Sequence, residues 1–515
     1  MKKENNQNCW FLLGPTGIGK SFVSLYLGQL YKNVIINTDA FSLYKEASIM
    51  TAKVSKEDQN KVQHKMIDIL DLFNINYNQY LFKKDALTEI NLIFKNNQIP
   101  LIVGGTNYFI ECLLFNYNNI SDNNNNINNN EEKYNPIEIM INDEKIKNMK
   151  LNDNTNSIYL LDEIKKIQNE VNINNNNKDE CYIKLNEYLN NKINKGEINK
   201  SDILYILSVL DEKYSLFYNE NDIRRIINVI AHNIIYSQKK SDIIKNQKIN
   251  LNFDKTKIII LFPKDLNELL KQITSRIDTM IENGLSEIIY IFHKFIINNK
   301  KINFEVGVLQ SIGYKEFYDL YKNLDINIIN NIYSFHIKET KEDNENNMNN
   351  IKIFNKNIIE NVINKDEKIK KLFNDCREKL INNTLNYAKY QIKFIKKRIL
   401  PFIKGYHIQE INVYSKEKYN EEYIPQMIKY LNNDEYIQIL EDKNKSKIEE
   451  WQKYFCEICQ CELNGDNEYN NHMKSNKHKK KKENLRKKEK YNKFKNEIDI
   501  NINNNKFNNI NINEE

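Results

Sequence analysis

Eight residues near the start of the sequence have the types and spacing of a phosphate-binding loop. Residues 14–21 read GPTGIGKS and fit the pattern G-x-x-x-x-G-K-[ST]. Glycines at these positions let backbone N–H groups turn toward phosphate oxygens, while the lysine adds a positive charge and the serine hydroxyl can hold Mg²⁺. The motif predicts a pyrophosphate site but does not say which reaction follows. Its expected phosphate ligands are Gly14, Thr16, Gly17, Ile18, Gly19, Lys20 and Ser21.

Asp39 is the next residue whose position could serve chemistry. It ends the apolar run NVIINTD, which has the composition of a buried strand. In an open parallel sheet, the carboxyl end of this strand faces the phosphate loop, and a carboxylate there could act as a general base. The alternative is that Asp39 caps the start of a following helix. An acidic residue ending a later strand, which ATP hydrolysis would use, is not evident in the sequence.

A third group has the spacing of a zinc site. Cys456 and Cys459 are followed by His472 and His478 in the order C-x2-C-x12-H-x5-H. Thiolates and imidazoles in this order bind structural Zn²⁺ tetrahedrally. A strand-like stretch precedes a helix-like one, so we expect a ββα zinc finger in which Cys461 is a bystander. The histidine spacing resembles that of U1/matrin-type fingers in RNA-binding proteins, and a protein-interaction finger is the alternative.

The elements that must position these residues form an alternating pattern. Between residues 9 and 117, strand-like apolar runs alternate with helical periodicity, which predicts a parallel sheet with crossover helices. The apolar run at 255–263 should return to that sheet. We therefore predict an α/β fold with a P-loop NTPase-like sheet core, an inserted helical domain and a C-terminal ββα finger. The expected domains are the P-loop-like core (1–117 and 250–405), a helical insertion with an Asn-rich loop (118–249), a linker (406–449), the finger (450–482) and a basic, then Asn-rich, tail (483–515).

The net charge of the 515-residue chain is +7, and its location matters more than its size. Residues 474–490 hold ten Lys/Arg and two Glu, so the rest of the chain is close to neutral. Such a run beside a zinc finger fits contact with nucleic acid, although a solvated surface or a localisation signal has the same composition. No apolar run approaches the roughly 18 residues of a membrane span. We expect no membrane contact, a monomer, and a cytoplasmic location, with an additional nuclear or mitochondrial pool permitted.

A long basic helix is expected at residues 370–400. Its residues Lys389, Lys393, Lys396 and Lys397 are spaced so that four ammonium groups share one helix face. This face suits contacts with nucleic-acid phosphates, and an ordinary solvated face is the alternative.

The phosphate loop is one of several segments that match a single family. The others are Asp39–Tyr44 (DAFSLY), Gly104–Tyr108 (GGTNY), Asn221–Arg225 (NDIRR), Arg276–Leu285 (RIDTMIENGL), Gln310–Glu316 (QSIGYKE) and the late block containing Thr384, Tyr387, Ala388 and Gln391. In this order they resemble the tRNA dimethylallyltransferases (tRNA isopentenyltransferases), in particular the eukaryotic form with a C-terminal zinc finger. Ala40 and Ser42 depart from the pattern, because the family has Ser and Gln at these two positions.

The resemblance implies a reaction and its participants. The family transfers a dimethylallyl group from dimethylallyl diphosphate to N6 of adenosine 37, next to the anticodon of tRNA, and releases diphosphate. Asp39 is then the base, Thr106 a hydroxyl in the reaction channel, and the phosphate loop the holder of the leaving group with Mg²⁺. The tRNA-binding residues that it implies, together with the basic helix, are Asp39, Ala40, Phe41, Ser42, Arg224, Arg225, Lys389, Lys393 and Lys397.

Three other functions stay open on the sequence alone. A P-loop ATPase or kinase with an RNA-binding finger would need a Walker B acid and a nucleotide-base pocket, and the sequence indicates neither. A cytokinin-type prenyltransferase would use free AMP, ADP or ATP as the acceptor, whereas the helical insertion, the finger and the basic tail favour a macromolecule. A protein that only binds RNA would have no need to keep Lys20, Ser21, Asp39 and Thr106.

Overall fold

The computed structural model describes most of the chain in two units. The described ranges are 7–119, 134–149, 157–173, 178–245, 247–341, 347–437 and 452–490. One unit comprises residues 1–117 and 249–443, and the other comprises residues 118–248 and 444–515. Most of the expected Asn-rich loop, the end of the expected linker and the tail beyond 490 lie outside the described residues. Among the described helices, none has the length and apolar character needed to cross a bilayer.

The first unit is built on a six-stranded parallel sheet. In spatial order its strands are β3 (His64–Lys65), β2 (Val34–Asn37), β4 (Pro100–Val103), β1 (Asn8–Leu13), β7 (Lys255–Pro263) and β8 (Gln409–Val413). The central strands are almost wholly buried apolar runs, as expected for a parallel sheet that is covered on both faces. Phe11 in β1 lies opposite Ile102 in β4 and Ile258 in β7, which fixes the register at the centre. The predicted α/β core is confirmed.

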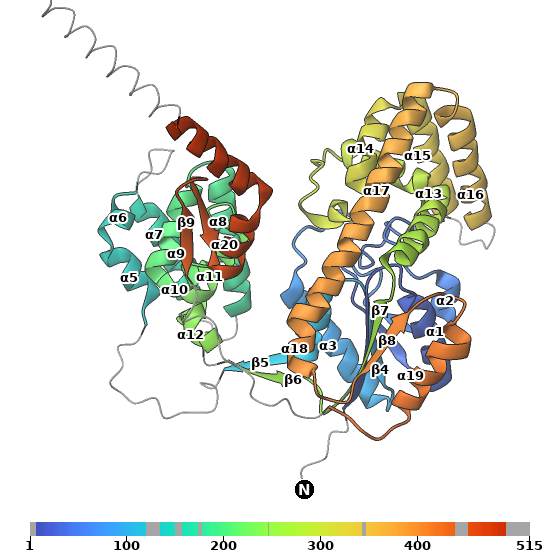
Figure 1. Cartoon of the computed structure of the whole chain (residues 1–515), viewed down its shortest axis with the longest axis horizontal. Coiled ribbons are helices and arrows are strands. Elements are labelled where there is room, and N and C mark those ends of the chain that lie inside the picture. Colours follow the sequence, from blue (N-terminus) through green and yellow to red (C-terminus); the bar gives the residue numbers. More distant parts are fainter. Residues whose placement is uncertain are drawn as a thin grey trace, which may run out of the picture. The chain divides into compact units, whose positions relative to one another are not determined.

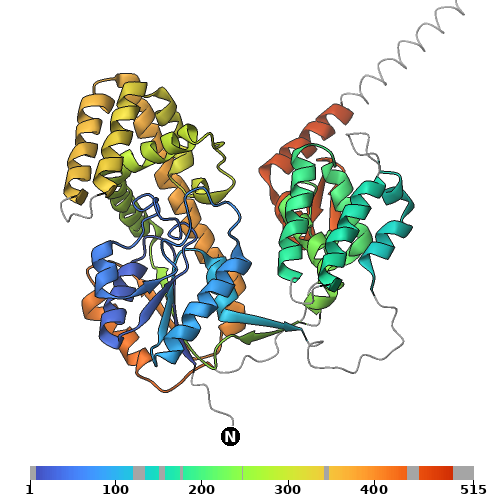
Figure 2. The same ribbon diagram turned by 180° about the vertical axis from the view of Figure 1, so that it is seen from behind.

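Helices flank the sheet and extend into a second, helical layer (Figures 1 and 2). The helices around the first strands are α1 (Lys20–Tyr31), α2 (Lys56–Lys61), α3 (Gln79–Lys95) and α4 (Asn107–Leu114). Those after β7 are α13 (Leu266–Ile297), α14 (Tyr314–Asn323), α15 (Ile326–Lys341), α16 (Asn347–Ile358), α17 (Glu367–Phe394) and α18 (Leu400–Ile403), with short 3-10 or π turns at Gly307–Gln310, Ile359–Ile363 and Ile395–Ile399. Asp265 and Asp366 cap α13 and α17 by accepting backbone N–H bonds in their first turns.

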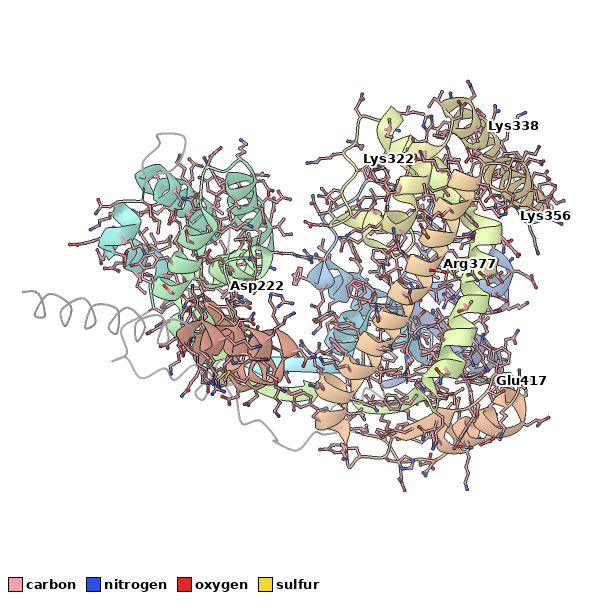
Figure 3. The ribbon with its side chains drawn as sticks, turned by 45° about the horizontal axis from the view of Figure 1, so that its top comes forward. Asp222, Lys322, Lys338, Lys356, Arg377 and Glu417 are labelled. Atoms are coloured by element: carbon pink, nitrogen blue, oxygen red, sulfur yellow. The ribbon has the colours of Figure 1, made fainter. Side chains whose placement is uncertain are left out.

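An ion pair ties the two long helices together. Arg377 on α17, labelled in Figure 3, donates from Nε and Nη2 to the two carboxylate oxygens of Asp278 on α13, at 2.6 and 2.8 Å. This bidentate geometry fixes the angle of the guanidinium as well as its position.

The prediction of a linker at 406–449 is wrong for the part of this range that the structure describes. Residues Gln409–Val413 form β8, the sixth strand of the sheet, paired in parallel with β7. A π turn at Tyr419–Tyr423 and α19 (Ile424–Leu431) follow, and Ile437 pairs with Thr256 as an isolated bridge. The buried Lys257 ammonium of β7 donates to the carbonyls of Tyr430 and Leu431 at the end of α19. This stretch is therefore part of the sheet unit.

The second unit contains a helical insertion with its own core. Its helices are α5 (Pro136–Asn142), α6 (Glu144–Lys147), α7 (Ser157–Ile173), α8 (Lys178–Asn194), α9 (Lys200–Leu210), α10 (Glu212–Ser215), α11 (Ile223–Tyr236) and α12 (Lys240–Lys245). Buried residues such as Ile164, Leu185, Leu207 and Ile227 form a cluster distinct from the core of the sheet unit. The chain enters and leaves this insertion through β5 (Phe115–Asn119) and β6 (Gln247–Leu251), which pair as a two-stranded sheet. The predicted inserted helical domain is confirmed as a structural element.

The same unit contains a small ββα module. Strands β9 (Lys453–Cys456) and β10 (Cys461–Asn464) are antiparallel, and α20 (Gly465–Lys474) follows directly. After a bend at Ser475 the chain is helical again through residue 490, and the lysines of this stretch are exposed. The predicted ββα order is confirmed.

Candidate active site and zinc site

Three adjacent strands end at one place. The phosphate loop follows β1, Asp39 lies two residues after β2, and Thr106 lies three residues after β4. These strands are neighbours in the order β2-β4-β1, so their carboxyl ends bring the three segments together. Ligands of open α/β proteins bind at this edge of the sheet.

The phosphate loop has the conformation that its motif predicts. Gly19 has φ of 104° and forms the N-cap of α1, so the N-terminus of the helix, with its first-turn amides, lies at the loop. A Cβ at Gly19 would lie 2.9 Å from the Tyr419 hydroxyl, which leaves room only for glycine. The Lys20 ammonium donates to the carbonyls of Gly14 and Pro15, both at 2.9 Å, and so closes the loop on itself.

Asp39 and Thr106 hold the opposite side of the site. The Asp39 carboxylate accepts from the N–H of Phe41 at 3.0 Å, so it caps a turn and not a helix. The Thr106 hydroxyl accepts from the N–H of Ala40 at 3.0 Å. A Cβ on Gly105 would lie 2.6 Å from the second Asp39 oxygen, so a glycine is needed for this close approach. We call the segment Gly105–Thr106 the acceptor loop.

Four residues that the motifs did not assign also reach the site. Arg276 of α13 donates from Nη1 to the Thr16 hydroxyl at 3.2 Å. Gln391 of α17 accepts from the N–H of Thr16 at 2.8 Å, and Tyr387 donates to the carbonyl of Gly105 at 2.9 Å. The Tyr419 hydroxyl donates to the carbonyl of Ile18. Arg276, Tyr387 and Gln391 stand in blocks that match the family, which is the signal that could have found them; Tyr419 had none.

The site combines two partly buried cations, Lys20 and Arg276, with one partly buried carboxylate, Asp39. Burial lowers the pKa of Lys20 to about 7, with repulsion from Arg276 adding to the effect and the Asp39 charge opposing it. Burial also raises the pKa of Asp39, although backbone N–H groups and Lys20 oppose this shift, and it lowers the pKa of Arg276. With Asp39 ionised and both cations protonated, the site is one positive charge in excess, which favours an anionic ligand.

The other predicted contacts with RNA lie in different places. Ser42 is only 5% exposed and Phe41 is half-buried, so within the Asp39 segment the side chains point mostly inward. Arg224 and Arg225 are exposed in the first turn of α11, in the second unit. The structure therefore gathers the phosphate loop, Asp39, Ala40 and Thr106, and holds the two arginines on a separate element.

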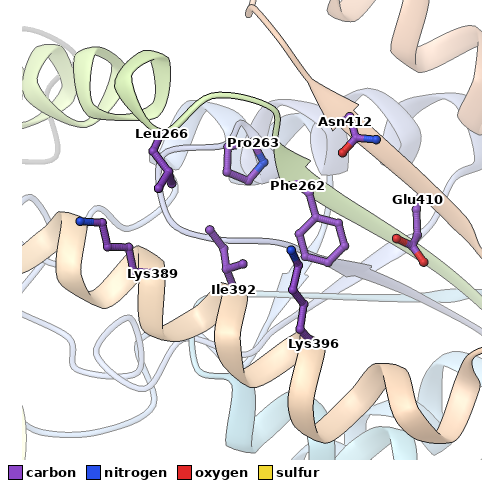
Figure 4. A pocket seen from close by; sticks show the side chains of 8 residues that line it. All are labelled: Phe262, Pro263, Leu266, Lys389, Ile392, Lys396, Glu410 and Asn412. Atoms are coloured by element: carbon purple, nitrogen blue, oxygen red, sulfur yellow. The ribbon is translucent and has the colours of Figure 1, made fainter. Parts of the chain in front are cut away.

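The four predicted lysines of the basic helix do not all line the same pocket. All four are exposed, and the π turn at Ile395–Ile399 changes the helical spacing within the set. Lys389 and Lys396 line a pocket of about 350 Å³ beside the end of β7 (Figure 4). The Lys396 ammonium lies 5.2 Å from the centre of the Phe262 ring, and Glu410 and Asn412 of β8 complete the polar lining. Lys393 and Lys397 are not among the lining residues.

The four predicted zinc ligands come together in the ββα module. The ligand atoms of Cys456, Cys459, His472 and His478 all lie within 4.8 Å of one another. His478 Nδ1 is 3.5 Å from each of the two sulfurs and 3.0 Å from His472 Nε2. These separations suit ligands placed about 2.0–2.3 Å from one tetrahedral Zn²⁺. Cys461 lies opposite Cys456 in the strand pair and is not in the cluster. The donor set fits a structural zinc ion.

Comparisons with known proteins agree with this architecture. The sequence profile of the family described as IPP transferase matches residues 42–179 and 159–398, and a profile described as zinc-finger double-stranded RNA-binding matches residues 453–479. A tRNA dimethylallyltransferase of Saccharomyces cerevisiae is 23% identical over 398 residues, covering 76% of this chain and 68% of the relative. One from Finegoldia magna is 28% identical over 323 residues, covering 62% and 81% respectively.

A solved structure matches the fold across nearly the whole chain. It is a eukaryotic dimethylallyltransferase acting on tRNA, with a TM-score of 0.63 and 21% sequence identity, and the match covers 95% of this chain and 100% of that one. At this identity the match shows a common fold. Because the family profile spans well over half of the sequence, the chain belongs to the IPP transferase family.

Proposed function

We propose that this protein transfers a dimethylallyl group from dimethylallyl diphosphate to N6 of adenosine 37 in tRNA and releases diphosphate. Family membership and the names of the two relatives give the reaction class and the acceptor. The observation that carries the proposal for this chain is the meeting of the phosphate loop, Asp39 and Thr106 at three adjacent strand ends.

The phosphate loop would hold the leaving group. As the allylic C–O bond breaks, negative charge grows on the departing diphosphate. The amides of residues 16–21, the N-terminus of α1, Lys20 and Arg276 supply positive charge and N–H donors where that charge develops. The Ser21 hydroxyl would be one ligand of Mg²⁺, with diphosphate oxygens as others, and the ion would neutralise part of the developing charge.

Asp39 would be the base for the nucleophile. The exocyclic amine of adenosine is a weak nucleophile because its lone pair is delocalised into the ring. A carboxylate that accepts a hydrogen bond from N6–H orients the amine and takes its proton, which contributes about 10²–10⁴-fold to the rate. Thr106 would act beside Asp39, and its contact with the N–H of Ala40, the residue after Asp39, supports this role.

Recognition of tRNA would use elements outside this site. The adenosine must leave the stack of the anticodon loop, at a cost of a few kcal/mol, so other contacts must hold the RNA. The exposed arginines Arg224 and Arg225, the lysines of α17 and the basic helix after the finger are suited to phosphates. The zinc ion would fix the finger from which that basic helix begins.

A direct test offers the purified, zinc-loaded protein three substrate mixtures with Mg²⁺. These are labelled dimethylallyl diphosphate with total tRNA, the same donor with AMP, and labelled ATP with tRNA. The proposal predicts transfer of label from the prenyl donor to tRNA and little phosphate release from ATP. Label on AMP alone would assign the cytokinin-type reaction, and ATP hydrolysis without prenyl transfer would assign an ATPase.

A further inference from the structure

Gln391 is wholly buried and joins the two halves of the active site. Its side-chain carbonyl accepts from the N–H of Thr16 in the phosphate loop at 2.8 Å. Its side-chain NH₂ donates to the carbonyl of Gly105 in the acceptor loop at 2.7 Å. The reversed amide would place donor against donor at Thr16 and acceptor against acceptor at Gly105, so only one orientation satisfies both ends.

The contacts of Gln391 continue to the proposed base. Gly105 precedes Thr106, whose hydroxyl accepts from the N–H of Ala40, directly after Asp39. Asn107 donates to the backbone carbonyl of Gln391 at 3.1 Å, which fixes this turn of α17 against the start of α4. A continuous series of hydrogen bonds therefore runs from the phosphate loop, through Gln391, to the segment that holds Asp39.

The N–H of Thr16 has two competing uses. It is one of the loop amides suited to a phosphate oxygen, and in this structure its partner is Gln391. A diphosphate oxygen that takes this N–H must share it with Gln391 or displace it. Either change acts on the Gly105 carbonyl, because the same amide group holds both loops.

We propose that Gln391 is a positioning residue that links diphosphate binding to the geometry of the acceptor loop. The inference rests on the proposed function, since it assigns the two loops to the leaving group and to the base. Gln391 acts through Thr16 and Gly105 and takes no part in bond making. Its loss should therefore slow the chemical step more than it weakens the binding of either substrate.

The first variant is Gln391→Met, which removes both hydrogen bonds while keeping a side chain of similar length. We expect kcat per folded protein to fall by about tenfold or more, as loss of one or two such hydrogen bonds predicts. The KM for dimethylallyl diphosphate and the KM for tRNA should each change less than about threefold. Equal kcat, or a loss wholly explained by raised KM values, would overturn the inference.

Two matched variants distinguish the positioning role of Gln391 from a general effect of α17 packing on stability. Tyr387→Phe removes the hydroxyl that donates to the Gly105 carbonyl and also bonds with Thr106 and Gln391, but it leaves the Thr16–Gln391 contact, so its kcat should fall less than that of Gln391→Met. Arg377→Met removes an ion pair elsewhere on α17, and it should lower the thermal midpoint without changing kcat. A kcat loss in Arg377→Met as large as that in Gln391→Met would mean that α17 acts only as a scaffold.

A double-mutant cycle tests whether Gln391 acts through the acceptor loop, and it stays informative if Gln391→Met is unstable. Gln391→Glu keeps an acceptor for the Thr16 N–H and loses the donor to Gly105. If Gln391 acts through the acceptor loop, Gln391→Glu combined with Thr106→Val should lose less kcat than the two single losses predict together. Strict additivity would contradict the inference. Inactive wild-type protein would instead contradict the proposed function, so the two failures are distinguishable.

Discussion

At the residue scale, the proposed reaction depends on Asp39 and Lys20, whose pKa values are shifted by burial. The sequence identified both from a motif and a strand end, because the residues that a phosphate loop needs are local in the chain. Their environment was not predictable from the sequence, since Arg276 lies 260 positions from Thr16 and Gln391 lies 375 positions from it. A local pattern does not pair residues that distant, so only the family resemblance, whose blocks contain Arg276 and Gln391, could point to them.

Asp39→Asn removes the proposed base and nearly preserves the shape of the side chain. We expect the single-turnover rate to fall by about 10²–10⁴-fold while tRNA affinity is kept. Because burial raises the pKa of Asp39, the wild-type rate should decline on the acid side at a higher pH than an ordinary carboxyl group would give. The decline occurs as pH falls, since only the ionised carboxylate accepts the proton. Near-normal turnover of Asp39→Asn in rapid-quench experiments would remove Asp39 as the base.

The lowered pKa of Lys20 predicts that the affinity for pyrophosphate falls as the pH rises, opposite in sign to the effect of Asp39 on the rate. Because its pKa is about 7, the Lys20 side chain is mostly a neutral amine at pH values above 7 in the ligand-free protein. Affinity for inorganic pyrophosphate should therefore weaken as the pH rises from about 6 to about 9, and binding above pH 7 should take up a proton. Calorimetry in buffers of different ionisation enthalpy measures this uptake. Lys20→Arg stays charged, so identical proton uptake by that variant would assign the effect to pyrophosphate and not to Lys20.

At the element scale, the parallel sheet and its crossover helices were predictable, but the edge strand β8 was not. Central strands read as continuous apolar runs because both of their faces are buried. The burial of β8 alternates, with Ile411 and Val413 buried and Glu410 and Asn412 exposed, and a short segment without a long apolar run predicts a linker. Regular α-helical spacing also does not predict the π turn at Ile395–Ile399.

Two truncations test the role of the segment after α18. A chain that ends at residue 437 keeps β8, Tyr419 and α19, whereas one that ends at residue 405 loses them. The shorter chain should be strongly destabilised, because each large buried apolar side chain lost from α19 removes about 1.5–3 kcal/mol. It should also bind pyrophosphate more weakly, since Tyr419 supports the loop at Ile18 and Gly19. Equal thermal midpoints for the two chains would mean that this segment is a linker after all.

At the scale of the whole molecule, the proposed catalytic residues lie on the sheet unit, whereas the proposed RNA contacts are divided between the two units of the chain. The sheet unit contains the phosphate loop, Asp39 and Thr106, whereas the exposed arginines of α11 and the basic helix after the finger belong to the other unit. Composition alone located the basic run, because its charge is concentrated in 17 residues. Spacing alone located the zinc ligands, because metal geometry requires them to converge.

Deleting residues 450–515 should weaken tRNA binding and leave part of the prenyl transfer. Each phosphate that the finger and its basic helix neutralise contributes roughly 0.7–0.9 to the slope of log affinity against log salt, so the slope should fall by about 2 or more. Replacing Lys479, Lys480, Lys481 and Lys482 with Gln is the matched charge control, since it spares the zinc ligands. Filter binding at several salt concentrations gives both slopes. A slope unchanged by the deletion would exclude this segment from the RNA contact.

The most direct test of the whole account is the position of the product within tRNA. Wild-type protein, tRNA and dimethylallyl diphosphate would be incubated with Mg²⁺, and ribonuclease fragments of the tRNA would be analysed by mass spectrometry. The proposed function predicts N6-dimethylallyladenosine at position 37 alone, and none in parallel reactions with Asp39→Asn or Lys20→Met at equal times. Modification at another adenosine, or equal modification by the two variants, would contradict it.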